Sequence, residues 1–332
     1  MSIDQPLAVQ VFPLPLVAGD TETLWPHKTA MTALLTITGT TASGKTRLAT
    51  ELAYCLNGEV ISADSRQVFR GMDIGTGKDL QDYVLHGEPI PYHLIDIRDA
   101  GEEYNLYQFL NDFRTAYDGI VARHNTPILC GGTGMYVDAV VRGYELPDAP
   151  VDAAFRSSIA HKSDSELTQR LASISSLHNH TDTETRERLV RALEIAEYRL
   201  QHPGSFTKIS NIEHVVVALR FPRAVLVKRI EQRLSERLDS GMVEEVEGLL
   251  KRGVPAERLL RYGLEYRHLT LFLQGHTSRT EMFENLFTDI RRFSKRQMTW
   301  FRRMERNGVA IHWIDGQLPL EEKVAEVMGI LI

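Results

Sequence analysis

The chain has little cysteine, no long apolar segment and no excess of positive charge. Its 332 residues include only Cys55 and Cys130, which fall in an expected helix and at the end of an expected strand. We therefore predict buried free thiols, as in a reducing cytoplasm, and neither a disulfide framework nor a cysteine-based metal site. No apolar run approaches the roughly 18 residues of a membrane span, so we predict no membrane partner.

The formal net charge is −6, which excludes a uniformly basic nucleic-acid-binding protein but allows a local basic face. Hydrophobic residues make up 43% of the chain, enough for a large core in one big domain or two. Nothing in the pattern resembles a long exposed apolar seam, so we expect a monomer.

Residues 1–32 differ from the rest of the chain. Prolines interrupt them, no helical period is visible, and no basic segment precedes an apolar core as in a signal peptide. We expect a disordered extension, or a start codon assigned too early.

The most informative stretch is a glycine-rich turn between a short apolar strand and a helix with leucines four apart. It matches the pattern G-x-x-x-x-G-K-[ST] and consists of Gly39, Thr40, Thr41, Ala42, Ser43, Gly44, Lys45 and Thr46. Inward-pointing N–H groups, the lysine charge and the helix dipole form a pocket for a di- or triphosphate. Thr46 offers a hydroxyl to a phosphate or to Mg²⁺. The motif leaves open which phosphate compound is bound and whether a phosphoryl group is transferred.

Two further polar positions follow expected strands. Residues 59–62 form a short strand that leads to Asp64, residues 92–96 form a third strand, and residues 127–130 form a fourth that leads to Thr133. Ligands of open α/β sheets bind at the carboxyl ends of the strands, which places both side chains within reach of the phosphate loop. Asp64 is alternatively the N-cap of a following helix. Alternating strands and helices predict an α/β fold, a P-loop NTPase-like parallel sheet flanked by helices.

The alternation of strands and helices stops near Pro147. Residues 151 to about 202 show helical periods without a convincing strand, and an apolar run at residues 214–219 returns the chain to the sheet. We therefore expect a first core part at 33–144, a helical insertion at 145–213, and residues 214–332 as core completion with a helical C-terminal region.

Two groups of basic residues stand out in the last third of the chain. Arg229, Arg233 and Arg237 are four residues apart and share one face of a helix, either as a salt-bridged solvent face or as a clamp for a pyrophosphate. Residues 291–306 hold seven basic residues and one acid, a local charge of 7 − 1 = +6, with aromatic residues such as Phe293 on the other half of the helix. One-sided charge favours a polyanion such as nucleic acid.

Taken together, these motifs resemble the bacterial tRNA dimethylallyltransferase family from about Leu34 to the C-terminus. The matching segments are residues 39–46, 61–76, 93–96, 131–133, 191–194, 229–233 and 295–300. Several ordered motifs over most of a chain are far more specific than a phosphate loop alone.

The resemblance implies transfer of the dimethylallyl group from dimethylallyl diphosphate to N6 of adenine 37 in tRNAs that read codons beginning with U, with release of diphosphate. It implies Asp64 as the general base, Thr133 as the hydrogen-bond partner of the bridging oxygen, and Arg233 as the group that neutralises the diphosphate. The phosphate loop would hold this diphosphate rather than ATP for phosphoryl transfer, with Mg²⁺ as cofactor and Thr46 as its ligand.

The resemblance also implies a tRNA surface, with the insertion closing over the anticodon stem-loop as a mobile domain. The positions that fall where the family touches tRNA are Asp64, Ser65, Arg66, Gln67, Thr133, Arg156, Glu187, Arg188, Leu189, Val190, Arg191, Tyr262, Arg267, Lys295, Arg296, Gln297, Thr299, Trp300 and Arg302.

Three other functions share parts of this pattern. A metabolite or nucleotide kinase also combines a phosphate loop with arginines, but this function does not explain the basic helix at 291–306. An isopentenyl transferase that acts on free adenylate lacks a use for the insertion and for that helix. An NTP-regulated RNA-binding module would need switch motifs after the loop, which the sequence does not contain.

Overall fold

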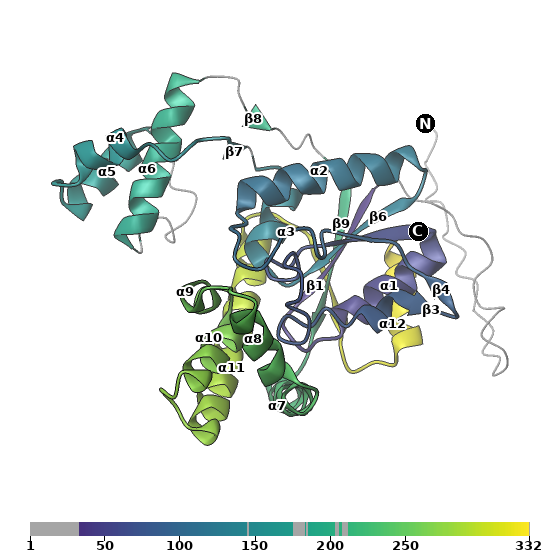
Figure 1. Cartoon of the computed structure of the whole chain (residues 1–332). Coiled ribbons are helices and arrows are strands. Elements are labelled where there is room, and N and C mark those ends of the chain that lie inside the picture. The colour runs from purple at the N-terminus through teal and green to yellow at the C-terminus, as the bar shows by residue number, and fades with distance from the viewer. Residues whose placement is uncertain are drawn as a thin grey trace, which may run out of the picture.

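The computed structural model describes residues 33–144, 146–174, 183, 185–202, 206–207 and 212–331, so the prediction for residues 1–32 lies outside the described residues. The core is a six-stranded parallel sheet with the order β10-β9-β1-β6-β2-β5 (Figure 1). Its strands are β1 (Leu34–Gly39), β2 (Gly58–Ser62), β5 (Tyr92–His93), β6 (Thr126–Gly131), β9 (His214–Arg220) and β10 (Ile311–Asp315). The predicted parallel α/β sheet is confirmed.

Successive strand residues face opposite sides of the sheet, and each side is covered by helices. Leu34 and Leu129 pack with α2 (Leu106–Ala122), α3 (Gly134–Val141) and the end of α11 (Arg279–Arg306). Leu35 and Ile128 pack with α1 (Lys45–Leu56) and α12 (Leu320–Leu331) on the other side. Both strand faces are apolar because both are buried, as in other parallel sheets.

A second group of helices packs together beside the sheet, below it in Figure 1. It comprises α7 (Arg223–Asp239), α8 (Met242–Lys251), α9 (Ala256–Leu259), α10 (Leu264–Leu273) and most of α11. Side chains from these helices surround Phe69 and Met72, which come from the loop after β2. This packing brings the second half of the chain to the loop that carries Asp64.

Three helices project from the sheet as a separate arm (Figure 1). They are α4 (Ala153–Ile159), α5 (Asp164–Ile174) and α6 (Arg186–Gln201), and they share a small apolar core that includes Leu167 and Leu193. A two-residue antiparallel pair, β7 (Leu146–Pro147) with β8 (Phe206–Thr207), stands at the base of the arm. The remaining short elements are η1 (Leu80–Tyr83), β3 (Val84–Leu85) and β4 (Glu88–Pro89).

The structure differs from the predicted strands in two places. The third strand, predicted for residues 92–96, ends at His93, because Leu94 and Asp96 adopt φ of +62° and +56° and break the extended backbone. We predicted no strand at residues 311–315, where β10 pairs with β9 at the sheet edge. This edge strand has only five residues and follows a long helix, so its local pattern is weak.

A buried carboxylate joins three elements at the amino end of β2. Glu59 is 3% exposed and accepts hydrogen bonds from Arg123 (2.8 and 2.7 Å), Asn125 (2.8 Å) and the His93 ring (2.7 Å). Burial alone would raise the pKa of Glu59, but the hydrogen bonds outweigh it and lower the pKa to about 2.

We expect Glu59→Gln to lower the free energy of unfolding at pH 7 by about 2–3 kcal/mol. The folded pKa of about 2 lies below the unfolded value of 4.5, so the stabilisation is complete above pH 4.5 and is lost as the pH falls toward 2. Urea unfolding at pH 7 and pH 3 should therefore give a smaller difference between variant and parent at pH 3. Equal differences at both pH values would contradict this account.

Candidate active site

A cavity of about 520 Å³ lies at the carboxyl ends of β1, β2 and β6, facing α7, α10 and α11. The predicted site residues that line it are Thr41, Ala42, Ser43, Gly44, Lys45, Thr46, Asp64, Ser65, Arg66, Gln67, Thr133, Arg233, Tyr262, Arg296, Gln297 and Trp300. Gly39 and Thr40 belong to the same turn but lie behind the lining, since Thr40 is 2% exposed. Residues far apart in the sequence thus meet in one cavity.

The conformation of the phosphate loop depends on its own backbone angles and on hydrogen bonds with two helices. Ala42 and Gly44 adopt φ of +60° and +82°, which turns the backbone into a left-handed conformation. Arg229 on α7 donates a hydrogen bond from Nε to the Ala42 carbonyl at 2.8 Å. The Thr41 N–H donates to Oε1 of Gln297 on α11, also at 2.8 Å. Two distant helices therefore hold the loop in its anion-binding shape.

Lys45 and Arg233 are partly buried cations of the cavity, which is also lined by the carboxylates of Asp64, Asp79, Asp82 and Glu265. Burial lowers the pKa of Lys45, and the Arg233 charge acts in the same direction. Burial, with the Arg237 charge, lowers the pKa of Arg233 to about 10, so its guanidinium stays charged at pH 7. No hydrogen bond or ion pair to another described residue involves the Arg233 side chain, whereas Arg237 binds Asp79 at 3.3 Å. Partial removal of such charges from water destabilises the folded protein, and a bound anion offsets this desolvation free energy.

The three arginines of α7 thus have different tasks. Arg229 tethers the phosphate loop, Arg237 is paired with Asp79, and Arg233 faces the cavity without a partner among the described residues. Of the two interpretations of this helix face, the anion clamp fits Arg233, and an ion pair is found only at Arg237.

Asp64 and Thr133 are brought together by the ends of β2 and β6. Gly131 is required there, because a Cβ on it would lie 2.2 Å from the Ala63 carbonyl oxygen. One oxygen of Asp64 accepts a hydrogen bond from the Arg66 N–H at 2.9 Å, so this carboxylate caps a turn rather than a helix. The Thr133 hydroxyl accepts from the Ser65 N–H at 3.1 Å, which leaves its proton free to be donated to a ligand.

Gln297 bridges the two loops that border the cavity. Its Nε2 donates to the Gly132 carbonyl at 2.8 Å while its Oε1 accepts from Thr41, and the side chain is 6% exposed. Both ends of the amide are therefore used within the protein. The side chain thus fixes the phosphate loop against the loop that carries Thr133, and a contact of Gln297 with tRNA stays a prediction.

We expect Gln297→Leu to lower the free energy of unfolding by about 2–4 kcal/mol, because two buried backbone groups lose their partners. The matched control is Gln232→Leu on α7, which removes only an exposed bond to Glu236. Urea denaturation of both variants measures the difference. A Gln297 variant as stable as the Gln232 control would show that the bridge contributes nothing.

The oxygen groups near the phosphate loop fit a metal ion that arrives with its ligand. Thr46, Asp64, Asp79 and Asp82 line the cavity. Within the described ranges, no group of three His, Cys, Asp or Glu residues could hold a metal ion by itself. Mg²⁺ prefers hard oxygen ligands, keeps several waters, and is bound by one or two carboxylates together with substrate phosphates. The donor set therefore fits Mg²⁺ bound with a diphosphate.

The predicted tRNA contacts outside the cavity fall on two surfaces. On α10 and α11, exposed side chains form a basic face that comprises Arg267, Lys295, Arg296, Thr299 and Arg302. Trp300 packs against Gly134, where a Cβ would lie 2.6 Å from the indole ring. This face continues into the mouth of the cavity through Arg296 and Trp300.

The predicted tRNA contacts in the projecting arm differ in their burial and in their partners within the arm. Arg156 and Arg191 both bind the buried carboxylate of Glu194, at 3.0 and 2.5 Å, and Arg191 also donates to the Ala149 carbonyl at 2.7 Å. Leu189 is 1% exposed in the apolar core of the arm, so its side chain does not reach RNA. The helix periodicity that buries every third or fourth residue explains why a contiguous segment cannot all face a partner. Glu187, Arg188 and Val190 lie on or near the surface of α6.

Three more residues line the cavity: Glu265, which lies in the segment 262–267 that the resemblance places at the tRNA, and two apolar residues whose place in the cavity we did not predict. Glu265 enters it from the start of α10, and burial raises the pKa of its carboxyl group, partly against the nearby Arg237 and Arg233 charges. Met135 and Phe293 line the cavity and are 39% and 38% exposed. Phe293 was expected on the apolar half of its helix, and its exposure shows that a local pattern does not tell a core from a cavity wall.

The fold and the cavity define a class of protein: a P-loop-like parallel sheet flanked by helices, in which a glycine-rich loop faces a carboxylate, a threonine hydroxyl and an arginine. Within the described ranges, no helix is long and apolar enough to cross a membrane. The model of the IPP transferase family matches residues 67–304 of the chain. The chain therefore belongs to the IPP transferase family, and the family predicted from the sequence is confirmed.

Known relatives are similar over nearly the whole chain. The tRNA dimethylallyltransferase 1 of Porphyromonas gingivalis is 53% identical over 297 residues, which cover 90% of this chain and 98% of the relative. The tRNA dimethylallyltransferase 2 of Trichlorobacter lovleyi is 51% identical over 284 residues, 85% of this chain and 92% of the relative. The crystal structure of the full-length tRNA isopentenylpyrophosphate transferase of Bacillus halodurans superposes with a TM-score of 0.66 at 31% identity, covering 91% and 96% of the two chains.

Proposed function

We propose that this protein transfers the dimethylallyl group of dimethylallyl diphosphate to N6 of adenine 37 in tRNAs that read codons beginning with U. The observation that carries the proposal is the single cavity in which the phosphate loop and Arg233 face Asp64, with an exposed basic helix face at its mouth. The phosphate loop and Arg233 can bind a diphosphate, and the Asp64 carboxylate can accept a proton from an acceptor amine. The basic helix face can bind the phosphate backbone of RNA. The names of the relatives agree with this substrate pair.

The acceptor side needs a base and an oriented amine. An exocyclic adenine amine is a poor nucleophile, so it must lie in line with the allylic carbon while its proton is removed. Asp64 takes that proton as the C–N bond forms, with its other oxygen fixed by the Arg66 N–H. The adenine must leave its stack to enter the cavity, at a cost of about a few kcal/mol that contacts between protein and RNA offset.

On the donor side, the C–O bond breaks as the C–N bond forms, and the diphosphate leaves with the electron pair. Lys45, Arg233 and the loop N–H groups stabilise its charge, and Thr133 donates its free hydroxyl proton to the bridging oxygen. Thr46 and the phosphate oxygens would hold Mg²⁺, which adds further neutralisation of the leaving group. The closing of the arm over the anticodon stem-loop, a monomeric state and action in the cytoplasm belong to the same proposal.

The test uses purified protein, Mg²⁺, dimethylallyl diphosphate labelled in its allyl group, and an unmodified tRNA with adenines at positions 36 to 38. We expect label in this tRNA and none in the same tRNA with guanine at position 37, nor in AMP. Label in AMP would assign the protein to the free-nucleotide transferases. Turnover of ATP without any label transfer would instead indicate a kinase.

A further inference from the structure

One wall of the cavity is a loop of residues 71–79, which we call the wall loop. Gly75, Thr76, Gly77 and Asp79 of this loop line the cavity. The wall loop packs closely on its neighbours: a Cβ on Gly75 would lie 2.8 Å from the Tyr266 ring, and one on Gly77 would lie 1.9 Å from an Arg237 nitrogen. The wall loop is therefore in close contact with Tyr266, which lines the cavity, and with Arg237 on α7.

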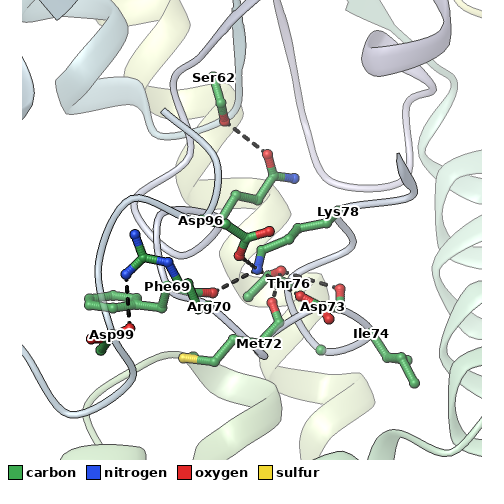
Figure 2. A network of polar contacts seen from close by, with 12 residues as sticks. Ser62, Phe69, Arg70, Met72, Asp73, Ile74, Thr76, Lys78, Asp96 and Asp99 are labelled. Atoms are coloured by element: carbon green, nitrogen blue, oxygen red, sulfur yellow. Dashed lines mark hydrogen bonds and ion pairs between the residues drawn. The ribbon is translucent and has the colours of Figure 1, made fainter. Parts of the chain in front are cut away.

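The side chain of Lys78 is buried beneath the wall loop and has only oxygen neighbours as partners (Figure 2). Its ammonium donates to the Phe69 carbonyl at 2.6 Å, to Asp73 Oδ1 at 2.7 Å, and to the Asp96 carboxylate. The side chain is 1% exposed, and burial of an ammonium group is tolerated only with such a set of acceptors. Phe69 and Asp73 come from the loop after β2, whereas Asp96 follows β5, so one cation connects these two segments.

The same network reaches the turn that carries Asp64. Gln67, three residues after Asp64, donates from Nε2 to the Gly77 carbonyl at 3.0 Å and accepts from the Ser62 hydroxyl at 2.8 Å. The Gln67 carbonyl in turn accepts from the Asp96 N–H at 3.1 Å. Lys78 is thus linked to both sides of the proposed reaction, the base turn through Gln67 and the Arg237 side through the wall loop.

We propose that Lys78 is a positioning residue that holds the Asp64 turn and the wall loop in a fixed relation. This inference rests on the proposed transferase function. The hydrogen bonds of Lys78 join none of the residues of the phosphate loop, which is tethered separately by Arg229 and Gln297. Loss of the ammonium should therefore disturb the alignment of base and acceptor while leaving the diphosphate site in place.

The test compares Lys78→Met with Lys251→Met, which removes an exposed lysine that pairs with Glu247 on α8. We expect Lys78→Met to lower kcat at saturating tRNA by about tenfold to a hundredfold, since a displacement near 1 Å can cost that much. The KM for dimethylallyl diphosphate should stay within about threefold of the parent. Single-turnover amplitudes give the active fraction, so that kcat is expressed per folded site.

Asp96→Asn serves as the second variant, because it weakens the same link and keeps the size of the side chain. This variant should also lower kcat, but by a smaller factor than Lys78→Met. If Lys78→Met does not fold, the kcat of Asp96→Asn tests the positioning role of Lys78. Unchanged kcat per active site, or a KM for the donor that rises as much as kcat falls, would overturn the inference. Absence of transfer in the parent and in Lys251→Met would instead refute the proposed function.

Discussion

Asp64→Asn is expected to lower kcat for transfer to tRNA by about 10²–10⁴-fold, the contribution of a well-placed general base. Asparagine keeps an oxygen that can accept from the Arg66 N–H, so the turn should keep its shape. Donor binding should be unchanged or tighter, because the substitution removes a negative charge that faces the diphosphate site. Single-turnover transfer measures the rate, and calorimetric titration with dimethylallyl diphosphate measures the affinity.

Asp99→Asn is the control for this experiment. It also converts a carboxylate to an amide, but at an exposed ion pair with Arg70. Its transfer rate should equal that of the parent. A rate for Asp64→Asn within tenfold of the parent would rule out Asp64 as the base. A large loss of donor affinity would instead indicate that the carboxylate helps to hold the Mg²⁺ that accompanies the diphosphate.

Arg233→Met is expected to lower kcat/KM for dimethylallyl diphosphate by about 10²–10³-fold, because the departing diphosphate loses a cation inside a water-poor site. The same substitution should raise the free energy of unfolding of the ligand-free protein by about 1–3 kcal/mol, since the fold no longer holds a partly buried charge that has no ion-pair partner among the described residues. The low pKa of about 10 for this arginine reflects that cost. Steady-state kinetics and urea unfolding measure the two effects.

Arg223→Met at the exposed start of α7 should change neither quantity, and Arg233→Lys should restore part of the activity. The opposite signs distinguish a ligand-binding arginine from a structural one. If Arg233→Met proved less stable than the parent, the side chain would have a structural partner that the proposed mechanism does not include.

The sequence predicts best where a function depends on residues that are neighbours in the chain. The phosphate loop, and the polar residues that end β2 and β6, follow from local patterns and from the geometry of parallel sheets. The helix of Arg229, Arg233 and Arg237 was also predictable, but its pattern gave all three the same environment. Only the packing of α7 against the phosphate loop and the wall loop separates their environments: Arg229 binds the Ala42 carbonyl, Arg237 binds Asp79, and Arg233 faces the cavity.

Other parts of the site could not be predicted from local patterns. Gln297 resembles any polar residue of a basic helix until the fold places it between Thr41 and Gly132. Arg156 and Arg191 resemble phosphate-binding residues until Glu194 is found between them. The partners of Gln297 are 256 and 165 residues away, and Glu194 is 38 residues from Arg156 although only three from Arg191. A single chain without its fold does not reveal which of these polar groups meet.

The bridge made by Gln297 has a consequence for the order in which the protein matures on the ribosome. Thr41, whose N–H donates a hydrogen bond to Gln297, precedes Gln297 by 256 residues in the chain, and Gly132 precedes it by 165 residues. At synthesis rates of about 5–20 residues per second, the phosphate loop waits roughly 13–50 s for that partner. The phosphate loop is therefore synthesised long before Gln297 is available to form the hydrogen bonds that fix the conformation of the loop. The complete cavity forms only when synthesis is nearly finished.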